Sequence, residues 1–210
     1  MAVLAFPAMP EEVVLLTGEV EGPHFRAILQ SVNRSLIVHH AETLEALAAT
    51  CGVPTQGGGV RRLVAFSTGV VVPRAILEGL GQPAYNFHPG PPTYPGSHAA
   101  SFAVYEGAER FGATVHEMTA KVDSGPIVAV EWFEMPANVR FMDLELATYK
   151  VLLKLFTDLA PTLATSDAPL PRINVNWSGR RRTKAEFEKM KVLEADMDEA
   201  EIRLRYRAFG

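Results

Sequence analysis

Cysteine, long apolar runs and excess positive charge are all scarce in this sequence, and each scarcity excludes a class of protein. A single cysteine, Cys51, excludes an internal disulfide framework. The apolar runs are too short for a transmembrane helix. The 20 basic residues are outnumbered by 24 acidic ones, so the surface as a whole is unsuited to nucleic acid. The first residues lack the basic segment and cleavage pattern of a secretory signal. We therefore expect a cytoplasmic protein without a membrane partner.

The 210 residues are enough for one α/β domain and an appendage. Helical patterns alternate with β-branched runs, which predicts a Rossmann-like, mostly parallel sheet with helices on both faces over residues 1–166. We expect strands at 13–17, 35–40, 61–66 and 84–88, a glycine-rich loop at 56–60, and a hairpin built from 112–118 and 126–135. Residues 142–164 show helical periodicity typical of core packing. Residues 167–210 are expected to form an appendage with a strand-like piece, a basic turn and two helices.

One stretch, "YNFHPGPPTYPG" at residues 85–96, ends the fourth expected strand with a run of prolines. Proline removes ladder donors, so the strand stops and Asn86 and His88 are expected to face one side of a cleft. Ligands of parallel sheets bind at the carboxyl ends of strands. A third polar residue, Asp123, lies in the turn "KVDSGPI". Each of the three also has an ordinary explanation: a turn cap, a buried structural histidine and a turn residue.

These residue types together suit chemistry in which a carbonyl oxygen gains negative charge. An asparagine amide offers two donors, and a histidine offers a donor or a base. An aspartate orients the histidine, and we expect Asp123 to raise the pKa of His88. The sequence has no Gly-x-Ser-x-Gly nucleophile motif, and Cys51 has no base beside it in sequence. Direct attack by a substrate amine is therefore favoured over a covalent intermediate, and we expect no metal site.

The segments "NFHPGPPTYPG" and "FGATVHEMTAKVDSGPIV" resemble the formyltransferase family, which uses 10-formyltetrahydrofolate. That family carries Asn-x-His-Pro, a Pro-x-x-x-Gly loop, Gly-x-Thr-x-His and Asp-x-Gly-x-Ile in this order. The resemblance extends over about residues 61–133. The motif positions in this sequence are Asn86, His88, Pro89, Pro92, Gly96, Gly112, Thr114, His116, Asp123, Gly125 and Ile127.

The resemblance implies a role for each residue group. Asn86 and His88 hold the oxygen of the formyl group while an amine attacks its carbon, and Asp123 helps to carry the amine proton to the departing folate nitrogen. The folate pocket is expected from Phe66, Ser67, Thr68, Gly69, Val70, Val71, Val72, Val122, Ser124 and Gly125. Candidate acceptor-binding residues are Tyr94, His98, His116, Trp177 and Arg180. His116 is explained equally well by the interior of the sheet, and His98 by a helix start.

Several functions stay open at this point. The leading one is N-formyl transfer to a small amine, such as a nucleotide-linked amino sugar, by a homodimer. In that case the turn containing Arg180, Arg181 and Arg182 binds a phosphate, and Trp177 stacks on a base or sugar, although basic turns are mostly solvated surface. The alternatives are methionyl-tRNA formyl transfer, formyl-folate hydrolysis and a non-catalytic folate- or nucleotide-binding module. The Gly90-Pro91-Pro92 sequence also resembles the formyltransferase-like domain of hydrogenase-maturation proteins, which raises a coenzyme A-type donor as an alternative.

Overall fold

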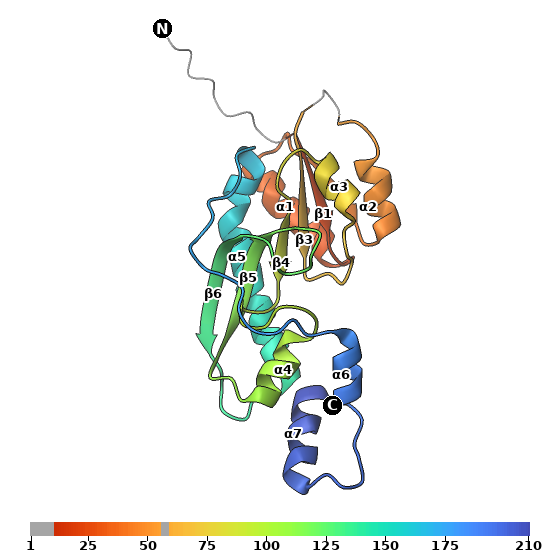
Figure 1. Ribbon diagram of the computed structural model, residues 1–210. Coiled ribbons are helices and arrows are strands. Elements are labelled where there is room, and N and C mark those ends of the chain that lie inside the picture. Colours follow the sequence, from red (N-terminus) through yellow and green to blue (C-terminus); the bar gives the residue numbers. More distant parts are fainter. Residues whose placement is uncertain (1–10, 56–58) are drawn as a thin grey trace.

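A six-stranded sheet forms the centre of the molecule in the computed structural model, which describes residues 11–55 and 59–210 (Figure 1). Most of the expected glycine-rich loop at 56–60 lies outside these residues. The strand order is β2-β1-β3-β4-β5-β6, with β1 to β4 parallel and the β4–β5 and β5–β6 pairs antiparallel. The expected mostly parallel sheet and its hairpin are confirmed. The strands are β1 (Glu12–Leu16), β2 (Ile37–Ala41), β3 (Arg61–Phe66), β4 (Tyr85–His88), β5 (Arg110–Glu117) and β6 (Ile127–Glu134).

Helices cover both faces of the sheet, because alternate residues of each buried strand point to opposite faces. Val13 and Leu15 of β1 pack in the cluster that includes α1 and α5, whereas Val14 and Leu16 pack in the cluster that includes α2 and α3. The helices are α1 (Glu21–Val32), α2 (Leu44–Cys51), α3 (Arg74–Gly79), α4 (Ala99–Glu106), α5 (Phe141–Thr165), α6 (Lys184–Met190) and α7 (Glu199–Phe209). No helix among the described residues combines the length and the apolar character needed to span a bilayer.

The end of α5 is fixed to the sheet by buried polar side chains. Arg62 of β3 is fully buried and donates to the carbonyl oxygens of Ser166 at 2.7 Å, Ala168 at 2.9 Å and Leu163 at 3.3 Å. Asn33 donates to the carbonyl of Ala164 at 2.9 Å. The last carbonyls of a helix have no partner within the helix. These two side chains therefore satisfy the Leu163 and Ala164 carbonyls at the end of α5.

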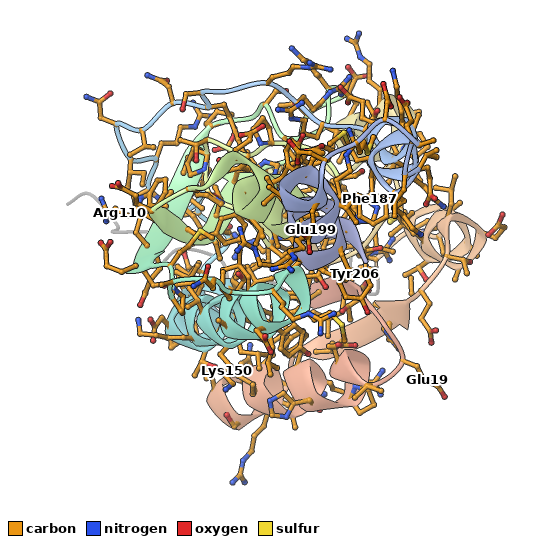
Figure 2. The ribbon with its side chains drawn as sticks, turned by 90° about the horizontal axis from the view of Figure 1, so that it is seen from below. Glu19, Arg110, Lys150, Phe187, Glu199 and Tyr206 are labelled. Carbon is orange, nitrogen blue, oxygen red and sulfur yellow. The ribbon has the colours of Figure 1, made fainter. Side chains whose placement is uncertain are left out.

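The appendage packs its two helices at one end of the molecule. Figure 2 looks at this end, where α7 lies next to α4 and α6. Phe209 of α7 packs edge-on against Phe102 of α4 and Phe187 of α6. The strand-like piece expected within residues 167–210 is not formed: the described residues contain no strand after β6. In this segment Ile173 N–H donates to the Ile127 carbonyl of β6, whereas Pro169 and Pro171 just before it cannot donate to a ladder.

Candidate active site

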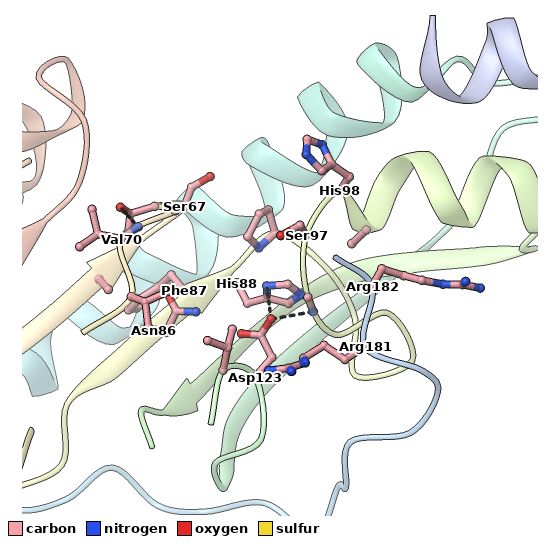
Figure 3. Close-up of a pocket in the computed structure, with 18 of the residues that line it drawn as sticks. Ser67, Val70, Asn86, Phe87, His88, Ser97, His98, Asp123, Arg181 and Arg182 are labelled. Atoms are coloured by element: carbon pink, nitrogen blue, oxygen red, sulfur yellow. Dashed lines mark hydrogen bonds and ion pairs between the residues drawn. The ribbon is translucent and has the colours of Figure 1, made fainter. Parts of the chain in front are cut away.

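One cavity of about 940 Å³ opens at the carboxyl ends of β3 and β4 (Figure 3). Ser67 and Val70 line one end of it, in the loop after β3, and Ser97 and His98 line the other, in the loop before α4. The Asn86–His88 strand end lies between them. A cavity of this size at the end of a parallel sheet is the usual form of a small-molecule site.

Strand pairing brings the polar residues of β4 and β5 together. In the antiparallel register Asn86 is opposite His116, and His88 is opposite Thr114. Asn86 and His116 are therefore on the same face of the sheet, and the Asn86 Nδ2 lies 3.2 Å from the His116 Nε2. The Thr114 hydroxyl donates to the Gly90 carbonyl at 2.7 Å and holds the chain just beyond the strand. The local structure thus matches the expectation that the prolines end β4 at the site.

Asp123 lies between the two histidines. Its Oδ2 is 3.5 Å from the His88 Nδ1, and its Oδ1 is 3.3 Å from the His116 Nε2 (Figure 3 draws the His88 contact). The backbone N–H of Gly96 donates to Oδ2 at 2.7 Å. His88, His116 and Asp123 are all buried. One carboxylate therefore links β4, β5 and the loop before α4.

Burial decides the protonation behaviour of this group. Burial lowers the pKa of His88, and the opposing effect of Asp123 only partly offsets it. Asp123 does raise the pKa of His88 as expected, but desolvation of the charged ring is the larger effect, so the pKa is lowered overall. Burial tends to raise the pKa of Asp123, but the neighbouring His88, His116 and Gly96 N–H outweigh it, so the pKa is lowered. The site accordingly favours a neutral His88 beside an ionised Asp123.

Each histidine ring lies between a backbone carbonyl and the Asp123 carboxylate. The His88 Nε2 lies 3.2 Å from the carbonyl oxygen of Tyr94, and the His116 Nδ1 lies 2.8 Å from that of Glu117. A carbonyl and a carboxylate both only accept, so each ring donates to one or both of these partners. The His116 Nε2 lies 3.2 Å from the Asn86 Nδ2 as well as 3.3 Å from the Asp123 Oδ1. The second N–H of the Asn86 amide stays available to a ligand.

Unusual backbone geometry is concentrated at this cavity. Among the described residues, four that are not glycine have positive φ, and three of them, Ser67, His98 and Asp123, line the cavity. The φ angles of the three are 45°, 56° and 46°. Such conformations persist only where the surrounding structure enforces them, and they cluster at functional sites. The geometry supports a functional assignment of the cavity that is independent of the sequence motif.

The structure brings together most of the expected site residues and places others nearby. The cavity is lined by these members of the expected set: Ser67, Thr68, Gly69, Val70, Val71, Val72, Asn86, His88, His98, His116, Val122 and Asp123. The remaining members of the expected set do not line the cavity: Phe66, Tyr94, Ser124, Gly125, Trp177 and Arg180.

The residues away from the cavity have identifiable structural contacts. Phe66 is in the core against Phe25 and Phe156, and the ring of Tyr94 packs against Phe111. Arg180 is ion-paired with Glu186.

The first half of α5 forms a wall of the cavity that sequence reasoning missed. Met142, Glu145, Leu146 and Tyr149 line it. Their spacing is helical and continues the apolar stripe that the sequence assigned to the core. Met142 and Leu146 are large apolar residues, four apart in the sequence, that lie beside that stripe. In the structure both stay exposed, which marks this face of the helix as a binding surface. Burial raises the pKa of Glu145.

The cationic residues at the end of the cavity near α6 differ in their partners. Arg182 is ion-paired with Glu106 and extends away from His88 in Figure 3. Arg181 and Lys184 also line the cavity, and within residues 11–55 and 59–210 neither has a carboxylate at ion-pair distance. The same described residues contain no cluster of histidine, cysteine and acidic side chains suited to a metal ion.

Comparison with known proteins gives one family match and a set of similar structures. Residues 60–151, fewer than half of the chain, match the family model described as formyl transferase. No curated protein sequence matches this one. The resemblance to the formyltransferase family that the motifs indicated is therefore confirmed over this segment, which contains Asn86, His88 and Asp123.

The similar solved structures share the fold at low identity. A 4-N formyltransferase from Francisella tularensis is 17% identical with a TM-score of 0.75, over 94% of this chain and 87% of that one. An N-formyltransferase from Helicobacter canadensis, in complex with folinic acid and dTDP-3-aminofucose, is 13% identical with a TM-score of 0.69, over 96% and 81%. HypX from Aquifex aeolicus, in complex with tetrahydrofolic acid, is 18% identical with a TM-score of 0.59, over 93% and 34%.

Proposed function

We propose that this chain, whose residues 60–151 match the formyl transferase family, is an N-formyltransferase that moves a formyl group from 10-formyltetrahydrofolate to the amine of a small molecule. The observation that carries the proposal is the buried His88–Asp123–His116 group with Asn86 at the centre of one large cavity. A non-catalytic binding module would not require two histidines around one carboxylate beside a free amide donor.

The residues at the centre of the cavity suit direct attack of an amine on the formyl carbon. As the new C–N bond forms, the formyl oxygen gains negative charge, and the free N–H of Asn86 is placed to donate to it. The neutral ring of His88, beside ionised Asp123, takes up the proton that the amine loses. That proton then passes to the folate nitrogen as the original C–N bond breaks. Because the amine attacks directly, Cys51 and a covalent intermediate are not required.

The donor is assigned to the end of the cavity lined by residues 67–72 and Val122. This wall is mostly apolar and is built from a loop and a turn, which suits a flat heterocycle. Val71 is 61% exposed and Val122 is also exposed, so part of the apolar wall faces solvent. The Helicobacter relative binds folinic acid and HypX binds tetrahydrofolic acid, which supports a folate rather than a coenzyme A-type donor.

A charge at position 71 is expected to weaken folate binding by at least about tenfold, because it interrupts the apolar wall. The variant is Val71→Asp, and the measurement is isothermal calorimetry with 5-formyltetrahydrofolate. Val53→Asp is the matched control, since Val53 is also 61% exposed but does not line the cavity. Binding of coenzyme A by the unaltered protein, without folate binding, would contradict the donor assignment.

The acceptor is assigned to the other end, between α5 and residues 181–184. Arg181 and Lys184 supply positive charge there. Two cations suit one or two phosphates, whereas a tRNA acceptor would need many phosphate contacts. The Helicobacter relative was solved with dTDP-3-aminofucose. We therefore propose a nucleotide-linked amino sugar as the acceptor, tested by assaying formylation of a panel of such amines against charged initiator tRNA.

Removal of Arg181 is expected to raise the KM for a phosphate-bearing acceptor by about 10- to 100-fold while kcat changes little, since a charge-assisted hydrogen bond of this kind is worth about 1.5–3 kcal/mol. Steady-state kinetics of Arg181→Ala measure this. Arg180→Ala is the control, because the neighbouring Arg180 is paired with Glu186 and lies off the cavity. Equal effects in both variants, or a loss confined to kcat, would remove the phosphate role.

A further inference from the structure

Residues 172–183, which lie outside the family match, are hydrogen-bonded to the loops that form the site. We call this segment the strap. At its start, Arg172 donates to both carboxylate oxygens of Glu117, each at 2.8 Å. Further along, Ser178 N–H donates to the Pro92 carbonyl and Arg182 N–H to the Pro95 carbonyl, both at 3.0 Å. Ser97 N–H donates back to the Arg182 carbonyl at 3.0 Å. The strap is therefore paired with the loop that joins β4 to α4.

Two glycines allow this close pairing. Gly96 has φ +97 and Gly179 has φ +79, in the left-handed region that favours glycine. A Cβ at Gly96 would collide with the carbonyl oxygen of Arg182, and one at Gly179 with that of Thr93. Gly96 is also the residue whose N–H donates to Asp123. The strap and the carboxylate are thus connected through one residue.

Trp177, in the middle of the strap, contacts both histidines and the Asp123 turn. Its ring is edge-on to the ring of His116, with centroids 5.0 Å apart, and to that of His88, with centroids 5.8 Å apart. Its indole N–H donates to the Gly125 carbonyl at 2.8 Å. Trp177 is not among the residues that line the cavity. Trp177 therefore packs on the side of His88 and His116 that is away from the cavity, where it does not contact a ligand.

We propose that Trp177 is a positioning residue, which keeps water from the His88–Asp123–His116 group and fixes the turn that carries Asp123. The strap is accordingly part of the active site, and the site is incomplete in a protein that contains only the family-matched segment. This inference rests on the proposed function for its effect on rate. The exclusion of water from His88 by Trp177, which we call the shielding, does not depend on that function and is tested separately.

The physical basis is the desolvation of His88. The titratable groups that face its ring are Asp123, from the turn after β5, and His116, from β5 itself. Asn86, the Tyr94 carbonyl and the indole of Trp177 are neutral. Burial is the largest influence on the pKa of His88 and lowers it. Removing the indole admits water, so the charged ring is better solvated and protonation shifts to higher pH.

The kinetic test compares Trp177→Ala, Trp177→Phe and Trp132→Ala over the acid side of the pH–rate profile. We expect Trp177→Ala to move the acid limb up by roughly one pH unit. Trp177→Phe keeps a ring but loses the bond to Gly125, so kcat should fall several-fold without a shift of the limb. The control residue, Trp132 on β6, packs under Arg110 and lies off the cavity, so its variant should match the unaltered protein. Trp177 variants with unaltered profiles and kcat would overturn the proposal.

A second measurement needs no catalysis and does not depend on how Trp177→Ala folds. The sequence has two tryptophans, so Trp132→Phe leaves Trp177 as the only indole. A protonated imidazole quenches a neighbouring indole, and the emission of Trp177 should therefore fall in one step as the pH is lowered. Adding His88→Asn should remove or displace the step. A step that depends on His88 but is centred at or above about 6.5, the ordinary pKa of an exposed histidine, overturns the shielding, because a shielded ring is protonated only at lower pH. A step that depends on His88 and is centred below that pH, in a protein without formyl transfer, would leave the shielding intact and reject the proposed function alone.

Discussion

Replacing Asn86 or His88 by alanine lowers turnover by about 10²- to 10³-fold, the loss expected for one donor to the charged oxygen or one proton acceptor. Asn86 loses the N–H that remains free after its contact with His116. His88 loses the ring that Asp123 and the Tyr94 carbonyl orient. Both effects should appear in kcat more than in KM, because the Asn86 contact strengthens only as the oxygen gains charge and His88 acts only as the amine loses its proton. Single-turnover kinetics with 10-formyltetrahydrofolate and the best acceptor amine measure them.

Substitutions of the same residue types elsewhere on the molecule separate this effect from general damage. Asn138→Gly and His24→Ala change exposed residues that do not line the cavity and should leave turnover unchanged; glycine is used at 138 because Asn138 has a φ of 55°. Melting temperatures should be recorded for all four variants, because His88 is only 5% exposed. Near-normal turnover in Asn86→Ala would remove its amide from the mechanism, and the same result in His88→Ala would remove the imidazole.

Replacing Arg62 by alanine is expected to destabilise the protein by about 3 to 5 kcal/mol. The guanidinium is fully buried and donates to the carbonyls of Leu163, Ser166 and Ala168. Without it these acceptors lose their partner and a cavity opens under α5. The loss is a large part of the stability of an ordinary domain. Denaturant unfolding monitored by circular dichroism measures it.

Two further arginine variants show whether the loss of stability comes from the buried hydrogen bonds of Arg62. Arg62→Lys keeps one positive charge but cannot reach several carbonyls at once, so it should fall between the alanine variant and the unaltered protein. Arg74→Ala removes an exposed arginine paired with Glu78 and should leave the unfolding midpoint where it is. A midpoint for Arg62→Ala equal to that of the unaltered protein would show that the buried contacts at the end of α5 contribute nothing to stability.

Local sequence rules were sufficient for the strands of the sheet and for the centre of the site, but not for the strand-like piece expected in the appendage. The proline run after His88 predicted where β4 ends, and the parallel-sheet rule then placed Asn86 and His88 at the cavity. His116 could not be assigned from its strand alone. Its position depends on the β4–β5 register, which places it opposite Asn86. The pairing of strands is a tertiary property that single-strand patterns do not encode.

The parts of the site that sequence reasoning misplaced are those formed by contacts between distant segments. Trp177 reaches Gly125 across 52 residues, and nothing near Trp177 in the sequence indicates two histidines as its neighbours. Its proximity to a basic turn favoured a ligand contact instead. The wall formed by Met142 and Leu146 was similarly hidden, because an apolar residue on a helix reads as core whether it faces a sheet or a cavity.

The contacts at the end of α5 also constrain when the protein can fold during its synthesis. Asn33 and Arg62 belong to the first third of the chain, but their carbonyl partners lie at residues 163–168. One face of β1 and β3 is covered by α5 as well as by α1. A chain leaving the ribosome therefore exposes that face, and a buried arginine without partners, until α5 has emerged. Domains assembled from contacts so far apart in sequence fold late, and their unfinished chains depend on chaperones. Ribosome-bound chains that stop before residue 140 should accordingly be degraded by protease far faster than chains that extend past residue 168.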